Sequence, residues 1–290
     1  MSIRRWIEGA ALGLLAGAAQ ADACHEALAR FDYTAATQLA SSAPASALSR
    51  MCAARAAYET GHFADALTRL REVEAAHPQG ETRTYLYNWL TVTLRKLGRE
   101  AEAMQYGQAA LAWARRETSR QNLATALHNL AGLAYTRGDA PAALALYRES
   151  IPLNPDLSER SASLNNVGLI YQAAGDRVEA ERWLADAIAL NRAQGHVHHL
   201  GKHLMNLGNL YREAGRYEDA QARLDEGAGL IDRVGDVYWQ AVAARYRGWL
   251  ARDRRDWAAA GRWLALAART YDAAGASVDG DATREELSRL

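Results

Sequence analysis

The sequence has 290 residues, 49% of them hydrophobic and 23% charged, so it can bury a large core and does not belong to the disordered class. Its 34 Lys and Arg residues balance 34 Asp and Glu residues, and no long run of one charge occurs, so nucleic acid is not an expected partner. Only 2 Phe and 5 Pro residues occur among abundant Ala, Leu, Arg and Glu, which favours helices and argues against a substantial β-sheet.

The N-terminal segment, residues 1–21, resembles a bacterial export signal. Arg4 and Arg5 precede an apolar stretch at residues 9–18, and a small-x-small cleavage sequence ends at Ala21. We therefore expect cleavage after Ala21 and a periplasmic or secreted mature protein. The alternative is a cytosolic N-terminal helix. No later segment of the sequence is apolar enough to span a bilayer.

The two cysteines, Cys24 and Cys52, both lie early in the mature chain. In an oxidising compartment they are candidates for one disulfide, and two buried free thiols are the alternative. Residues 21–24 also resemble a bacterial lipobox, in which Cys24 would carry the lipid, although Asp22 is unusual at its position.

A glycine recurs between apolar helical stretches at a nearly fixed spacing. The spacings along the chain are 37, 40, 37 and 40 residues, and Arg255 stands 40 residues after the last of these glycines in the same context. A period of this length in a helix-rich chain predicts helical repeats. The recurring glycines are Gly61, Gly98, Gly138, Gly175 and Gly215.

The two clearest repeats, residues 167–180 and 207–220, share four marks in phase. Glycine and alanine remove side chains where two antiparallel helices touch, and tyrosine fills the space beside them. Asp176 and Asp139 can cap the second helices of their repeats. The marks are Gly168, Tyr171, Gly175 and Ala180 in one repeat and Gly208, Tyr211, Gly215 and Ala220 in the other.

These marks resemble the tetratricopeptide repeat. The resemblance implies an all-α, right-handed α-solenoid of about seven antiparallel helix pairs plus a short C-terminal capping helix. The units of about 40 residues exceed the usual length of about 34 and resemble the long-repeat types of kinesin light chains and peptide-sensing regulators.

A single repeat domain is expected over residues 22–290, because no linker is long enough to divide the array. It comprises a degenerate first unit at 23–42, repeats over 45–275 and a C-terminal cap at 281–290. The predicted helix pairs after the first unit are 45–77, 81–117, 121–153, 157–193, 197–233 and 237–274.

Catalytic signatures are missing from the sequence, which has no Gly-x-Ser-x-Gly elbow, phosphate loop, Cys-x-x-Cys or His-Glu-x-x-His. We expect no enzyme and no cofactor. Four histidines cluster at His196, His198, His199 and His203, and the last two stand one helical turn apart. No carboxylate or cysteine at ligand spacing completes a metal site, so we predict none.

The resemblance places the concave groove on the first helix of each pair, and function is expected there. Equivalent positions on these helices carry Asn repeatedly, then Arg and Trp toward the C-terminal end. The predicted peptide- or partner-binding residues are Asn88, Arg95, Asn129, Asn165, Asn209, Arg212, Arg245, Trp249 and Arg252.

Both parts of this surface have two interpretations. A repeated Asn amide can bind an extended peptide backbone, or it can hold adjacent repeats in register. Trp249 between Arg245 and Arg252 can anchor an acidic or aromatic side chain or a C-terminal carboxylate, or it can fill the core between repeats. The sequence leaves these alternatives open.

The predicted function is an exported, non-enzymatic scaffold or adaptor that binds a peptide or a partner segment in its groove. The alternative is an outer-membrane-associated lipoprotein subunit of an envelope assembly complex, lipidated at Cys24.

Overall fold

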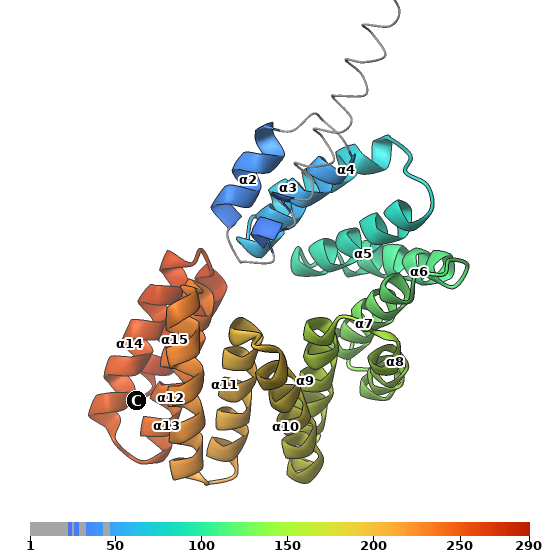
Figure 1. The fold of residues 1–290 in the computed structure, drawn as a ribbon. Coiled ribbons are helices and arrows are strands. Elements are labelled where there is room, and N and C mark those ends of the chain that lie inside the picture. Colours follow the sequence, from blue (N-terminus) through green and yellow to red (C-terminus); the bar gives the residue numbers. More distant parts are fainter. Residues whose placement is uncertain (1–22, 25, 29–32, 43–46) are drawn as a thin grey trace, which may run out of the picture. The chain divides into compact units, whose positions relative to one another are not determined.

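The structure is a computed structural model that describes residues 23, 24, 26–28, 33–42 and 47–290 (Figure 1). All regular secondary structure in these residues is helical, which confirms the all-α fold class. The predicted export signal lies outside the described residues.

The helices divide into two compact units, residues 1–146 and 147–290. The division falls inside helix α8 (Ala140–Leu153), so the single domain predicted over 22–290 stays a prediction. The first unit contains α2 (Tyr33–Ser42), α3 (Ala47–Glu59), α4 (Phe63–Ala75), α5 (Glu81–Lys96), α6 (Glu100–Ala114) and α7 (Arg120–Thr136). The second contains α9 (Leu157–Ala173), α10 (Arg177–Gln194), α11 (Val197–Glu213), α12 (Tyr217–Val234), α13 (Val237–Asp253), α14 (Trp257–Ala273) and α15 (Ser277–Ser288).

Helix boundaries agree closely with the predicted pairs except at the C-terminal end. The capping helix begins at Ser277, four residues earlier than the predicted cap at 281–290. Gly275 ends α14 in a left-handed conformation, and α15 starts two residues later, as the first helix of a new repeat would. Asp279 and Gly280 are weak helix formers, so the sequence did not indicate that the helix begins before them.

Recurring glycines end the first helix of a pair in a left-handed conformation. Gly215, for example, has φ +75°, which permits the chain to reverse into the second helix. Arg255, at the equivalent position of the last pair, also adopts φ +63°. The predicted caps form as well: Asp176 accepts a bond from the amide of Glu179, and Asp139 accepts one from that of Ala142.

Close packing within a hairpin depends on a second set of glycines. A methyl group on Gly208 would lie 2.9 Å from Cγ of Leu224 and 3.2 Å from the backbone oxygen of Ala220. Gly168 and Gly248 meet the equivalent leucines at 2.8 Å. The small residues therefore set how closely the two helices of each pair approach.

First helices form the inner side of each unit. Within the first unit α3, α5 and α7 touch in turn, and within the second α9, α11 and α13 do so. No comparable contact joins α4 to α6, α10 to α12 or α12 to α14. A stack whose first helices lie closer together than its second helices curves toward the first helices, which is the side where a groove was predicted.

Candidate functional site

Most hydrogen bonds between successive first helices join residues 41 positions apart. Asn206 donates to Oδ1 of Asn165 at 2.9 Å, and Gln172 donates to a carboxylate oxygen of Glu213 at 2.7 Å. The same offset recurs in both units, so it defines the register of neighbouring repeats. Further pairs are Asn129–Asn88, Ser158–His199, Arg212–Asp253, Tyr238–Asp279 and Arg245–Glu286.

The predicted asparagine stripe lies inside this network. Asn88, Asn129, Asn165 and Asn209 are all buried, with at most 8% of the residue exposed. Asn129 donates to the backbone oxygen of Asn88 at 3.3 Å, and Asn88 donates to that of Asn122. These contacts favour the interpretation in which the amides hold repeats in register, since a buried amide that is already bonded offers little to a ligand.

The predicted Arg–Trp–Arg face at the C-terminal end is brought together, but it already has an acidic occupant. The guanidinium of Arg245 lies 4.9 Å from the centre of the Trp249 ring. Nε1 of Trp249 donates to Glu286 of α15 at 2.8 Å, and Nε of Arg245 donates to the same carboxylate at 3.2 Å. Burial raises the pKa of Glu286, but hydrogen bonds from Arg245 and Trp249 outweigh it and hold the pKa below its ordinary value.

Arg212 and Arg252 continue this face differently. Arg212, whose side chain is 10% exposed, pairs with Asp253 and lies 5.4 Å from the centre of the Trp249 ring. The side chain of Arg252 is 40% exposed and bonds to its neighbour Asp253 at 3.3 Å. Trp249 is partly buried, so it is neither a fully enclosed core residue nor a free anchor. The structure therefore leaves Arg252 as the accessible cation of the group.

In the first unit, α3 and α5 carry a group of aromatic and cationic side chains that the sequence did not single out. Arg55 of α3 places its guanidinium 5.5 Å from the centre of the Trp89 ring. Tyr58 packs edge-on against Trp89, with the ring centres 5.4 Å apart. Burial raises the pKa of Tyr58 to about 12, while the charge of Arg95 opposes that rise.

The histidine cluster takes part in hydrogen bonds with neighbouring helices. His198 bonds to Asp236 at 2.6 Å, and His203 contacts the amide of Asn191 at 2.8 Å. Burial lowers the pKa of His199 and of His203 to about 3, and the charge of Lys202 adds to this. No group of three metal-binding side chains is present in the described residues.

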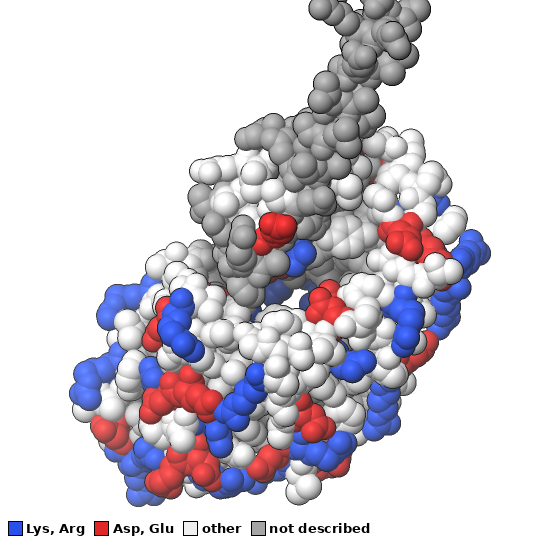
Figure 2. All heavy atoms as spheres, viewed as in Figure 1, with Lys and Arg blue, Asp and Glu red and all other residues white. Residues whose placement is uncertain are grey.

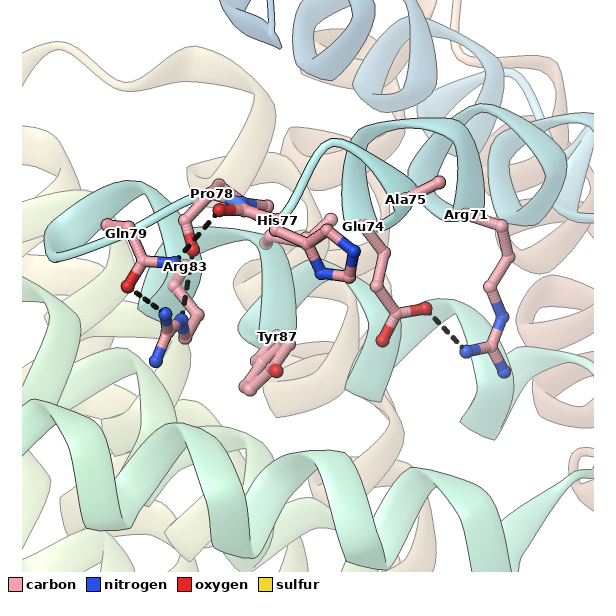
Figure 3. A pocket seen from close by; sticks show the side chains of 9 residues that line it. Arg71, Glu74, Ala75, His77, Pro78, Gln79, Arg83 and Tyr87 are labelled. Atoms are coloured by element: carbon pink, nitrogen blue, oxygen red, sulfur yellow. Dashed lines mark hydrogen bonds and ion pairs between the residues drawn. The ribbon is translucent and has the colours of Figure 1, made fainter.

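A cavity of about 400 Å³ lies where α4 meets α5 (Figure 3). Arg71 points toward Glu74 on one side, and Arg83 is held by Gln79 and the backbone oxygen of Pro78 on the other. Both guanidinium groups are thus already bonded, and none of the predicted site residues lines the cavity.

Cys24 and Cys52 come together as the disulfide prediction requires. Both are fully buried, and their Cα atoms are 6.3 Å apart, within the range that a disulfide spans.

The visible surface offers no large patch of one charge. Figure 2 shows Lys and Arg interspersed with Asp and Glu across the face it presents of the second unit. Among the described residues, none of the helices combines the length and apolar character that crossing a membrane requires.

Comparison with known proteins identifies relatives in sequence and in fold. The chain is 30% identical over 120 residues to the photosystem I assembly protein Ycf3 of Synechococcus sp. strain CC9311, which covers 41% of this chain and 65% of the relative. It is 33% identical over 124 residues to the Ycf3 protein of Prochlorococcus marinus strain MIT 9303, which covers 43% of this chain and 67% of that relative. The chain thus spans about two thirds of the curated relatives it matches.

Solved structures resemble it at the level of fold. A Rap protein complexed with Competence and Sporulation Factor superposes with a TM-score of 0.65 at 15% identity, covering 84% of this chain and 74% of that chain. PilF of Pseudomonas aeruginosa superposes with a TM-score of 0.53 at 19% identity, covering 81% and 96%. The family model of the tetratricopeptide repeat matches residues 82–156 and 159–229, half of the sequence. The chain therefore belongs to the tetratricopeptide repeat family.

Proposed function

We propose that this chain is an exported, non-enzymatic scaffold whose first helices bind an extended segment of a partner protein. The observation that carries the proposal is the continuous inner side formed by successive first helices in each unit. Repeats of this family present such surfaces to protein partners. That the Ycf3 relatives are named assembly proteins is consistent with a scaffold.

The repeats belong, on this proposal, to the long subtype. Bonded residues on neighbouring first helices are 41 positions apart, and Gly175 and Gly215 stand 40 apart. Longer helices widen the inner side of each repeat, which gives an extended ligand more surface to contact.

Export is proposed together with a disulfide between Cys24 and Cys52. Thioether lipidation of Cys24 and this bond exclude each other, because each consumes the same sulfur. The buried position of Cys24 beside Cys52 favours the bond over the lipoprotein alternative. Intact mass of the mature protein distinguishes them: a chain that begins at Asp22 and is two hydrogens lighter than the reduced form supports export with a disulfide, and a lipid-bearing Cys24 supports the alternative.

The binding role is tested by a pull-down from the exported fraction with wild type and the Trp249→Ala/Arg252→Ala variant side by side. If this face is an interaction hot spot, partner affinity should fall about thirtyfold or more, equivalent to about 2 kcal/mol. Melting temperature is measured on the same variant. A Trp249 that serves only the core would cost about 3 to 5 kcal/mol of stability and leave the affinity of the folded fraction unchanged, which would contradict the proposal.

A further inference from the structure

Arg95, on the inner side of the first unit, lacks the acidic partner that Arg212 has at the equivalent position of the second unit. Arg95 and Arg212 are each the last residue but one of a first helix, α5 and α11. Arg212 pairs with Asp253, the last residue of α13, which lies 41 positions further on. The residue 41 positions after Arg95 is Thr136, the last residue of α7.

Thr136 does not replace the missing carboxylate. Its hydroxyl donates to the backbone oxygen of Gly132 at 3.0 Å. Arg95 forms no ion pair with any carboxylate of the described residues, and its Nε is buried without a hydrogen-bond partner. A buried guanidinium N–H without an acceptor is energetically unfavourable, so an anion that accepts a hydrogen bond from Arg95 would be stabilised there.

Arg55 of α3 repeats this situation nearby. Its Nε is also buried without a partner, and it too has no ion pair with a described carboxylate. Glu59 follows one turn later but is exposed and does not bond to it. Arg55 stacks on Trp89, and Tyr58 packs against the same ring, while the charge of Arg95 acts on Tyr58.

We propose that Arg95, together with Arg55 beside the rings of Trp89 and Tyr58, binds an Asp or Glu side chain of an extended partner segment. The proposal rests on the proposed function and names the chemistry of its ligand in the first unit. A side-chain carboxylate supplies the acceptors that both guanidinium groups lack, and the aromatic rings take the methylene groups beside it.

The experiment uses a fluorescein-labelled, C-terminally amidated peptide of alternating Glu and Ala, and the same peptide with Gln in place of Glu. We expect anisotropy to show the Glu peptide binding at least tenfold more tightly than the Gln peptide at low salt. Arg55→Gln and Arg95→Gln should each weaken the Glu peptide about tenfold or more. The matched control is Arg69→Gln on α4, whose side chain is 39% exposed and paired with Asp65, and it should change nothing.

Thr136→Asp provides a variant that separates the site from a structural role. The substitution places a carboxylate at the position that corresponds to Asp253, where it should pair with Arg95 as Asp253 pairs with Arg212. The affinity for the Glu peptide should therefore fall, while the melting temperature should not. Equal binding of the Glu and Gln peptides, or an unaltered affinity in Thr136→Asp, overturns the inference. If the pull-down with full-length chain still captures a partner, only this inference fails. If neither experiment detects binding, the proposed function fails as well.

Discussion

Arg245 and Glu286 lie 41 residues apart and form an ion pair that joins α13 to α15. The carboxylate also accepts a bond from Trp249, so the C-terminal helix places an acid where the sequence predicted a site for an acidic ligand. Glu286 thus bonds to α13 in the way that a residue on the first helix of a further repeat would.

Replacing Glu286 by Gln should lower the stability of the second unit by about 1 to 2 kcal/mol. The change removes the charge that neutralises Arg245, whose side chain is only 17% exposed, but leaves an acceptor for Trp249. Urea denaturation measures the loss. The control is Glu285→Gln on the same turn, because that side chain is 64% exposed and its pair with Arg289 contributes little. Equal stability of both variants would show that the Arg245–Glu286 pair does not stabilise the packing of α15 against α13.

Hairpin packing gives a second prediction. Gly208→Ala should destabilise by about 1 to 3 kcal/mol, because its Cβ would lie 2.9 Å from Leu224 and 3.2 Å from a backbone oxygen that cannot move aside. Gly229→Ala is the matched control on α12, where nothing lies within 4 Å of the added methyl group. This second change should raise stability by about 0.5 to 1 kcal/mol through helix propensity. Thermal denaturation compares them, and a shift of the same sign in both would contradict the packing argument.

Most of the fold could be predicted from the sequence, because its determinants are local. Gly175 and Gly215 mark the turns, Asp176 marks a cap, and all three act within a few residues of their own position. The pairing of Arg212 with Asp253 could not be predicted, since it depends on the register between repeats, which only the packed structure fixes. For the same reason, the sequence identified Arg95 as a site residue but could not show that Arg95 lacks an acidic partner.

The asparagine stripe shows a second limit of prediction from sequence. A helix face bearing Asn129 and Asn165 has the same pattern whether it meets a ligand or the next repeat. Only the burial of these side chains and their bonds to Asn88 and Asn206 favour the second interpretation.

Strain at Arg255 gives a third prediction. A non-glycine residue at φ +63° carries a steric cost that glycine avoids, so Arg255→Gly should stabilise the protein by about 1 kcal/mol. The reciprocal change Gly215→Arg, at φ +75° in the preceding pair, should destabilise by a similar amount. Urea denaturation of the two variants tests the sign, and the prediction fails if Arg255→Gly is the less stable protein.

Reduction of the proposed disulfide gives a fourth prediction. Thiol titration of the exported, unreduced protein should find no free thiol, and two free thiols would refute the bond. By loop-entropy estimates, linking residues 28 positions apart contributes about 3 kcal/mol, so reduction should weaken the N-terminal helices first. Hydrogen exchange measures this locally: amides of α3 should lose protection on reduction while those of α13 keep theirs.

Acid sensitivity follows from the buried histidines of α11. The folded protein lowers the pKa of His203 to about 3, first by burial and then by the charge of Lys202, while an unfolded histidine titrates near 6.5. Between these values the unfolded chain binds more protons than the folded one, so stability is fully present above about pH 6.5 and is lost as the pH falls toward 3.

His203→Gln isolates this contribution from that of the carboxylates, which also lose their ion pairs in acid. Wild type should lose on the order of 2 kcal/mol more than the variant between pH 7 and pH 4.5, because glutamine has no proton to take up and can still bond to Asn191. His196→Gln, on the exposed residue that precedes α11, serves as the control and should follow the wild-type curve. Urea denaturation at each pH gives the free energies of unfolding. Parallel curves for wild type and His203→Gln would show that the buried imidazole does not control the acid response.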